Sequence, residues 1–279
     1  MQHSSFEPKS DAGGELRQVR IEPVFPTPTQ TDEFPWSPAA AKRRLVHGFD
    51  SRNASSRSFN LIRSKLVTLH RERGWRLLGV ASATPNVGKS FVSSNVAAAM
   101  SRDPRFQTYL LDLDLRRGTI KDIFGIDTDD GIVKYLEQPD APSVLPGFMP
   151  QGQELIIIPS VAGPVHSAEL LASERATALF RAMRISEERN YFICDLPPVF
   201  ANDDAAIIME ALDGYVIVAQ DGKTTQREIA ATVEMLGHER LAGVVLNKYR
   251  GGLVSEGYGI EDRYASEYYA NADSEGAEA

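Results

Sequence analysis

The chain has 279 residues, of which 42% are hydrophobic and 24% charged, and its formal net charge is −8. This composition excludes a wholly disordered, a collagen-like and a disulfide-rich chain, and the length suits one large α/β domain with tails or two small domains. The single cysteine, Cys194, cannot form an internal disulfide bond and gives no sign of an oxidising compartment. No apolar run reaches the roughly 18 residues that span a bilayer, so we expect no membrane span, and the polar segment 1–15 predicts no secretion signal.

The acidic charge lies mainly near one end of the chain. Residues 1–57 contain 8 basic and 7 acidic residues, whereas residues 251–279 contain 1 arginine and 7 acidic residues. An acidic balance argues against nonspecific binding of nucleic acid. We therefore expect no nucleic-acid partner, and an acidic tail over residues 251–279.

A flexible, proline-rich arm is predicted over residues 1–57. Residues 1–45 contain 6 of the 16 prolines and show no sustained helical or strand period, and each proline removes a backbone hydrogen-bond donor. The simplest interpretation is a solvated leader, and the alternative is a docking segment that Phe25, Phe34 and Trp36 anchor.

Between residues 58 and 250, short apolar runs alternate with amphipathic segments. A helix is predicted over 58–73 from the helical spacing of Phe59, Ile62, Leu66 and Leu69. The apolar runs predict strands at 76–81, 108–113, 155–159, 191–195, 215–219 and 241–246. Further helices are predicted near 90–100, 168–183, 203–211 and 225–236. Apolar strands separated by helices indicate one α/β domain over 58–250, with a mainly parallel sheet and helices on both faces.

The first predicted strand runs into residues 83–90, Ala-Thr-Pro-Asn-Val-Gly-Lys-Ser. This segment matches the P-loop template G-x-x-x-x-G-K-[ST] except that Ala83 replaces the first glycine. The backbone N–H groups of such a loop and the following helix N-terminus bind phosphate, so we expect Lys89 to reach the β- and γ-phosphates of a nucleotide and Ser90 to bind Mg²⁺. The alternative is an ordinary strand–helix turn that happens to contain Gly-Lys-Ser. The predicted nucleotide contacts are Thr84, Asn86, Val87, Gly88, Lys89, Ser90 and Phe91.

Carboxylates follow two other predicted strands. Asp112 and Asp114 lie at the carboxyl end of the second strand, where ligands bind in open α/β sheets. Alternation of side chains places both on one side of the strand, where they can face a metal ion or an attacking hydroxyl. Asp195 ends a later apolar strand, which is the Walker B pattern of an acid that holds Mg²⁺. We therefore predict a magnesium site at Ser90, Asp112 and Asp195.

Together these motifs resemble those of the bacterial tyrosine kinases (BY-kinases) of capsule and exopolysaccharide synthesis, over about residues 58–250 and the tail. The matching segments are 83–90 (Walker A), 109–116 (Walker A′), 193–198 (Walker B), 168–171, 204–205 and 245–247. Within the last of these, Asn247 is similar to the asparagine that reads adenine in this fold. The Glu-x-x-Arg-x-x-Arg pattern that the family uses in ring assembly falls on Arg57, Asn60 and Arg63, where the last residue alone matches.

The resemblance implies a P-loop NTPase-type kinase that transfers the γ-phosphoryl group of Mg·ATP to tyrosine. A phenol with a pKa near ~10 is a poor nucleophile at neutral pH, so a carboxylate helps by positioning it and accepting its proton. Asp112 and Asp114 are the candidates for this role, while Lys89, Mg²⁺ and Arg116 would offset the developing charge. The implied substrates are tail tyrosines of a neighbouring copy, at Tyr258, Tyr264, Tyr268 and Tyr269.

The resemblance also implies partners and a location. It implies a membrane-embedded polysaccharide co-polymerase as activator, a tyrosine phosphatase as opponent and further copies of the chain as a homo-oligomer. The protein would lie in the cytoplasm, at the inner face of the plasma membrane through its activator. An alternative is an ATP-switched assembly or partitioning-type ATPase without kinase function, whose additional signature lysine would fall at Thr84 and is absent. A third possibility is a docking adaptor that has lost ATP binding.

Overall fold

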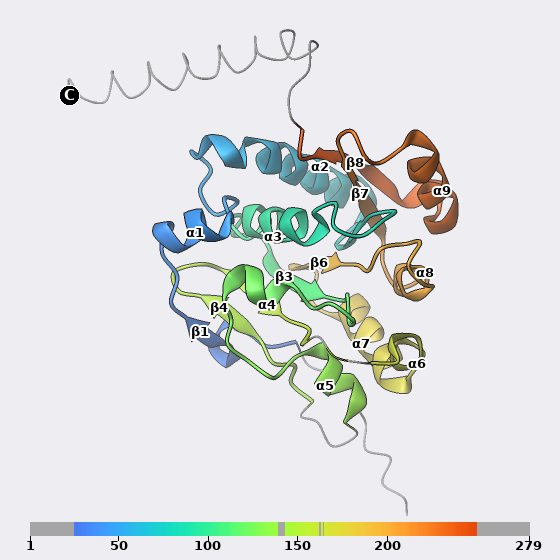
Figure 1. Cartoon of the computed structure of the whole chain (residues 1–279). Coiled ribbons are helices and arrows are strands. Elements are labelled where there is room, and N and C mark those ends of the chain that lie inside the picture. Colours follow the sequence, from blue (N-terminus) through green and yellow to red (C-terminus); the bar gives the residue numbers. More distant parts are fainter. Residues whose placement is uncertain (1–24, 139–142, 162, 164, 250–279) are drawn as a thin grey trace, which may run out of the picture.

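A computed structural model of the chain describes residues 25–138, 143–161, 163 and 165–249. Its centre is a sheet of eight strands in the order β1-β4-β5-β3-β6-β2-β7-β8, with helices on both faces (Figure 1). The strands are β1 (Asp32–Phe34), β2 (Leu77–Ala81), β3 (Gln107–Asp112), β4 (Phe148–Pro150), β5 (Leu155–Ile158), β6 (Asn190–Asp195), β7 (Gly214–Gln220) and β8 (Leu241–Asn247).

All six predicted strands are present, as β2, β3, β5, β6, β7 and β8. Neighbouring strands pair in parallel except β4 and β5, which pair antiparallel at Phe148 and Ile157. The predicted mainly parallel α/β fold is therefore confirmed. Strands β1 and β4 were not predicted, because three residues are too few to show a period of two.

Helices cover the sheet on both sides (Figure 1). They are α1 (Pro38–Arg44), α2 (Arg57–Arg73), α3 (Lys89–Met100), α4 (Ile120–Phe124), α5 (Ile132–Glu137), α6 (Ser167–Leu171), α7 (Glu174–Ile185), α8 (Asp204–Met209) and α9 (Gln226–Leu236), with 3-10 turns at Pro28–Gln30, Ala54–Ser56 and His238–Arg240. The helix predicted near 168–183 is in fact two helices. Ser173 separates them, because its side chain accepts a hydrogen bond from the Ala176 N–H and so begins α7.

The central strands are buried on both faces, which explains their continuous apolar sequences. Leu111 and Cys194 point into a core that α5 to α9 cover. Leu110 and Ile193, one residue earlier in the same strands, point into a second core beneath α2, α3 and α4. The sheet is therefore the middle layer of three, and its carboxyl edge is left for the loops.

Residues 25–57 do not form the predicted flexible arm. The ring of Phe25 is buried in the core, with its centroid 5.5 Å from that of Tyr109 and 4.9 Å from that of Phe192. Burial of an aromatic side chain removes a large apolar surface from water and so offsets part of the entropy that the segment loses when it is ordered. The prediction of a flexible arm is thus wrong for residues 25–57, while residues 1–24 lie outside the described residues.

The other two aromatic anchors also pack on the domain itself. Phe34 lies in edge strand β1, and Trp36 packs its ring against Phe124 of α4, with centroids 5.5 Å apart. A proline that follows them begins a short helix: Pro38 is the first residue of α1, where a missing N–H costs nothing. The alternative prediction of a docking segment is therefore closer to the structure, with the chain's own domain as the surface.

The predicted acidic tail, 251–279, lies outside the described residues, together with Tyr258, Tyr264, Tyr268 and Tyr269. Among the described helices, none is both long and apolar enough to cross a membrane.

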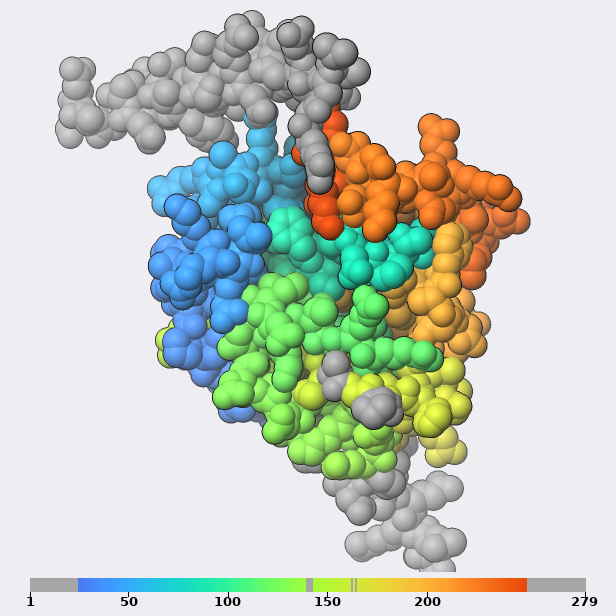
Figure 2. Space-filling model, in the orientation of Figure 1, coloured from blue at the N-terminus to red at the C-terminus, as the bar shows by residue number. Residues whose placement is uncertain are grey.

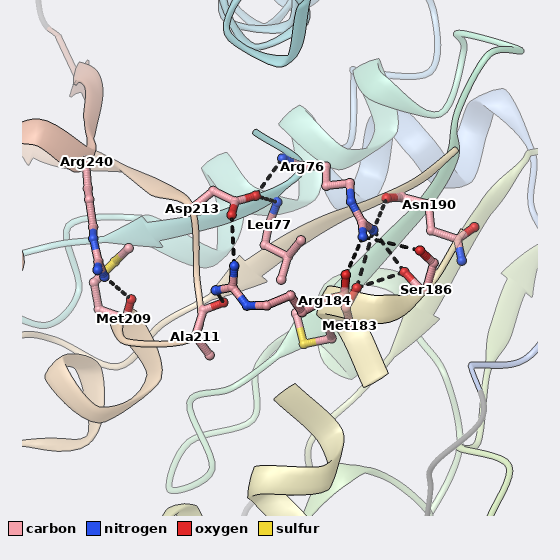
Figure 3. Close-up of polar contacts among 10 residues, drawn as sticks. All are labelled: Arg76, Leu77, Met183, Arg184, Ser186, Asn190, Met209, Ala211, Asp213 and Arg240. Atoms are coloured by element: carbon pink, nitrogen blue, oxygen red, sulfur yellow. Dashed lines mark hydrogen bonds and ion pairs between the residues drawn. The ribbon is translucent and has the colours of Figure 1, made fainter. Parts of the chain in front are cut away.

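A polar network fastens the amino-terminal edge of the sheet (Figure 3). The Asp213 carboxylate accepts hydrogen bonds from the backbone N–H groups of Arg76 and Leu77, at 2.8 and 2.9 Å, and lies 3.7 Å from the guanidinium of Arg184. The guanidinium of Arg76 donates to carbonyl groups at the end of α7, including that of Arg184 at 2.6 Å. The start of β2 is thereby joined to α7 and β7.

Replacing Asp213 by alanine is expected to lower the free energy of unfolding by about 2 kcal/mol, because it leaves two strand N–H groups without their acceptor. Denaturant unfolding of the purified protein measures this change. Glu234→Ala, an exposed position on α9, is the control and should unfold like the wild type. Equal stability of Asp213→Ala and the wild type would contradict the role given to this carboxylate.

Candidate active site

The segment 83–90 connects β2 to α3, in the strand–loop–helix order of a P-loop. Asn86 and Gly88 have positive φ angles of 63° and 99°. A Cβ atom at Gly88 would collide with the side-chain amide of Asn247, so both the backbone conformation and the space require glycine. Ala83, in place of the first template glycine, does not have a positive φ, and its methyl group therefore causes no backbone strain.

The predicted metal-binding carboxylates lie side by side. Asp112 ends β3 and Asp195 ends β6, and the two residues are direct neighbours in the parallel ladder. Both side chains are fully buried. Burial, and then the charge of Asp195, holds the pKa of the Asp112 carboxyl well above its usual range, and burial likewise raises the pKa of Asp195. Two buried carboxyls this close repel each other when both are ionised, and a bound cation would offset this repulsion.

The oxygens around these carboxyls fit a hard divalent cation. The Ser90 hydroxyl donates to Oδ2 of Asp195 at 2.5 Å, while Oδ1 of Asp195 is buried and finds no hydrogen-bond partner among the described residues. In the part of the chain that the structure describes, no group of three or more His, Cys, Asp and Glu side chains is placed to hold a metal. Mg²⁺ suits such a sparse site, because it takes one or two carboxylates and completes its shell with phosphate oxygens and water.

Lys89 and Asp114 face each other across the P-loop. Nζ of Lys89 lies 3.7 Å from Oδ2 of Asp114, and both side chains are less than a tenth exposed. Burial raises the pKa of Asp114, and the cations Lys89 and Arg117 oppose this shift. A cavity of about 170 Å³ opens here, lined by Pro85, Asn86, Gly88, Lys89, Ser90, Phe91, Asp114, Arg117, Thr119 and Pro198.

Arg116 is not among the residues that line this cavity. Its Nε donates to the Ser167 hydroxyl at 2.7 Å and lies 3.7 Å from Oδ2 of Asp204, which draws the side chain toward α6 and α8. The next residue, Arg117, lines the cavity instead, and its guanidinium donates to the side-chain oxygen of Asn86 at 3.3 Å. Sequence reasoning missed Arg117, although it directly follows the Asp-x-Asp-Leu-Arg motif.

Two more residues reach the site without a sequence signal. The Thr119 hydroxyl donates to the Ser90 hydroxyl at 2.7 Å, because the chain turns back toward the P-loop after Gly118, whose φ is 42°. At the end of β8, Lys248 donates to the backbone carbonyl of Asn86 at 2.8 Å.

The remaining predicted nucleotide contacts are spread around the loop. The side-chain amide of Asn247 donates to the Val87 carbonyl at 2.9 Å, so the end of β8 is held on the P-loop. Phe91 packs edge-on against Phe59 of α2, with ring centroids 5.7 Å apart. The carbonyl of Thr84 accepts a hydrogen bond from the Ser82 hydroxyl at 2.9 Å.

The loop, the strand-end carboxylates and the sheet order together define a P-loop NTPase-type kinase-domain fold. The chimerical protein CapA2B2 has this fold, with a TM-score of 0.66 and 21% identity over 79% of this chain and 94% of that one. The kinase domain of the Escherichia coli tyrosine kinase Etk superposes with a TM-score of 0.61 and 22% identity, over 79% and 92%. The septum site-determining protein MinD of Pyrococcus horikoshii, solved with Mg-ADP, has a TM-score of 0.53 and 18% identity, over 64% and 72%.

Curated proteins with similar sequences are named as tyrosine-protein kinases. The putative tyrosine-protein kinase EpsB of Ralstonia nicotianae is 30% identical over 239 residues, which are 80% of this chain and 30% of EpsB. The tyrosine-protein kinase CpsD of Streptococcus agalactiae is 28% identical over 213 residues, 74% of this chain and 90% of CpsD. No family model matches the sequence. This chain is thus a homologue of the bacterial tyrosine kinases, as its motifs predict, and it spans less than a third of the length of relatives such as EpsB.

Proposed function

We propose that this chain is an ATP-dependent protein tyrosine kinase that phosphorylates tyrosines in the tail, 251–279, of a neighbouring copy. One observation carries the proposal: Lys89, Ser90 and Asp114 line a single cavity beside the P-loop, and the Ser90 hydroxyl donates to the buried carboxylate of Asp195. The names of the curated relatives, which are tyrosine-protein kinases, support the choice of tyrosine as acceptor.

In this proposal the P-loop binds the phosphates of ATP and the carboxylates bind Mg²⁺. The backbone of the loop and the first turn of α3 bind the phosphates of ATP, and Lys89 exchanges Asp114 for the β- and γ-phosphates. Ser90, Asp112 and Asp195 hold Mg²⁺, which when bound neutralises charge on the β- and γ-phosphate oxygens. Asn247, whose amide now rests on the loop, is the proposed contact to the adenine ring.

The transfer step needs a group that orients the tyrosine hydroxyl. Asp114 borders the cavity, whereas Asp112 is fully buried beneath it, so Asp114 is the proposed proton acceptor. The phenol oxygen forms a bond to the γ-phosphorus as the bond to the β–γ bridging oxygen breaks; the phenolic proton passes to Asp114, and ADP leaves. Lys89 and Arg117 offset the charge that develops on the transferred group, and in this role Arg117 replaces the predicted Arg116.

We also propose the bounds of the kinase domain, its location in the cell and its partners. We propose that the kinase domain extends over 25–250, with the packed segment 25–57 as part of it. We also propose that it works in the cytoplasm with a membrane-embedded polysaccharide co-polymerase as activator and a tyrosine phosphatase as opponent, in the regulation of capsule or exopolysaccharide synthesis. Each phosphate adds about −1.5 to −2 charges to a tail that is already acidic, and the resulting repulsion would favour release of an assembled state.

Incubation of the purified protein with Mg·ATP, followed by mapping of phosphotyrosine, tests the proposed function. Phosphate is expected on the four tail tyrosines, and a variant with all four changed to phenylalanine should lose it while still binding ATP, because the P-loop is unchanged. The matched control is Tyr249→Phe, an exposed tyrosine that precedes the tail. ATP hydrolysis without any phosphotyrosine, even with the cytoplasmic segment of a membrane partner present, would instead favour the partitioning-type ATPase.

A further inference from the structure

Residues 34–49, here called the strap, lie across the helices α3 and α4. In Figure 2 the blue surface that contains the strap borders the green surface of the domain. The strap comprises the end of β1, all of α1 and the turn that follows it. It lies outside the motifs of the proposed site, yet it contacts both helices that follow those motifs.

The side-chain amide of Asn95 fixes the strap to α3, the helix of the P-loop. Asn95 is fully buried, and its Oδ1 accepts hydrogen bonds from the backbone N–H groups of His47 and Gly48, at 2.7 and 3.1 Å. Its Nδ2 donates to the carbonyls of Leu45 and Phe91, at 3.0 and 2.9 Å. All four hydrogen-bonding positions of the amide are therefore used, three of them on the strap.

Arg44 fixes the strap to the carboxyl end of α4. Its Nη1 donates to the backbone carbonyl of Asp122 at 2.8 Å, a contact that caps the last turn of the helix. Gly125, which ends α4 with a φ of 70°, leaves no room for a Cβ atom against this guanidinium. On the same side, the Trp36 ring packs against Phe124. The strap therefore holds the carboxyl end of α4 through Arg44 and Trp36.

The amino ends of α3 and α4 contribute to the proposed magnesium site. Ser90 lies in the first turn of α3, and the N–H of Ile120, the first residue of α4, donates to Oδ2 of Asp112 at 3.0 Å. Thr119, directly before α4, donates to the Ser90 hydroxyl. Because α4 has only five residues, a shift of its carboxyl end moves its amino end as well.

We propose that the strap positions α3 and α4 for binding of the magnesium-bound nucleotide, with Arg44 and Asn95 as positioning residues. The inference rests on the proposed nucleotide site and adds a means of regulating it. Since coupling between two sites is reciprocal, nucleotide binding must change the strap, and any partner that holds or releases the strap must change nucleotide affinity.

Substitution of Arg44 tests the coupling. We expect Arg44→Ala to weaken binding of Mg·ADP by about fivefold, at the low end of measured couplings between sites, and to leave the affinity for ADP in excess EDTA unchanged. Arg44→Lys keeps a donor for the Asp122 carbonyl and should recover part of the loss. Arg43→Ala, an exposed neighbour on the same helix, is the matched control. Calorimetric titration measures the affinities of the full-length wild type and of the three variants. An Arg44→Ala protein with wild-type affinity for Mg·ADP would overturn the inference.

The fluorescence of Trp36 gives a readout that loss of stability would not produce. The chain contains two tryptophans, so Trp75→Phe leaves Trp36 as the sole indole. We expect Mg·ADP to change its emission with the same midpoint as the calorimetric titration, and Arg44→Ala to reduce that change. Calorimetric binding with no response of Trp36 would refute the coupling alone. A wild-type chain that binds no Mg·nucleotide would refute the proposed function itself.

Discussion

Lys89→Met is expected to lower tyrosine phosphorylation by about 10³-fold or more, since it removes the side-chain cation that the P-loop offers to the transferred phosphoryl group. The position of Lys89 in the structure explains why this substitution should slow phosphoryl transfer. Lys89 lies at the first turn of α3, less than a tenth exposed, and its ammonium group has Asp114 as its ionic partner. Methionine occupies a similar space and carries no charge. The rate of phosphotyrosine formation, measured at saturating Mg·ATP, gives the result.

Two comparisons separate this loss from unfolding. Lys134→Met removes a lysine that pairs with Asp130 on the surface, an arrangement worth little to stability, and it should keep the wild-type rate. Lys89→Met leaves the buried Asp114 without its cation and is expected to lower the melting temperature. Circular dichroism at the assay temperature shows whether the variant is folded. A tenth or more of wild-type activity in Lys89→Met would mean that phosphoryl transfer does not use this loop.

Asp114→Asn is expected to reduce kcat by about 10²- to 10⁴-fold, the range for loss of a general base. The amide keeps the shape of the side chain but cannot take the phenolic proton. ATP affinity should not fall, because the change removes a negative charge from the cavity and frees Lys89 for the phosphates. The expected pattern is therefore a low kcat with an unchanged or lower KM for ATP.

Steady-state kinetics over a range of ATP concentrations measure both constants. The matched control is Asp130→Asn, an exposed carboxylate beside Lys134, which should behave like the wild type. A kcat within threefold of the wild-type value for Asp114→Asn would show that another group accepts the proton, and Asp112 would then be the next candidate.

The sequence predicts those parts of the fold that depend on neighbouring residues. Six strands follow from continuous apolar runs, and the P-loop and strand-end carboxylates follow from short motifs whose residues are adjacent in the chain. The register that sets Asp112 directly beside Asp195 depends on how β3 and β6 pair, and these strands are distant in the chain. The motifs imply that the two residues are near each other, and the structure adds that they are neighbours in one ladder.

What the sequence could not predict depends on contacts between distant residues. Prolines indicate where backbone donors are missing, but they do not show that Phe25 and Trp36 find apolar surfaces 80 or more residues away in the chain. The same limit applies to the site. Thr119 and Lys248 reach the P-loop because a turn and an edge strand carry them there, and no local pattern marks either residue.

The pairing of Asp112 with Asp195 affects the stability of the protein with its site empty. A sheet centre with two adjacent buried carboxyls is less stable than one with apolar residues in their place, so the empty protein gives up stability to keep its site. A cation and a nucleotide bound at the proposed site would restore stability by mass action. If the proposed site binds them, the protein with cation and nucleotide bound would resist heat and proteolysis better than the empty protein, and its lifetime would report how much of it is bound.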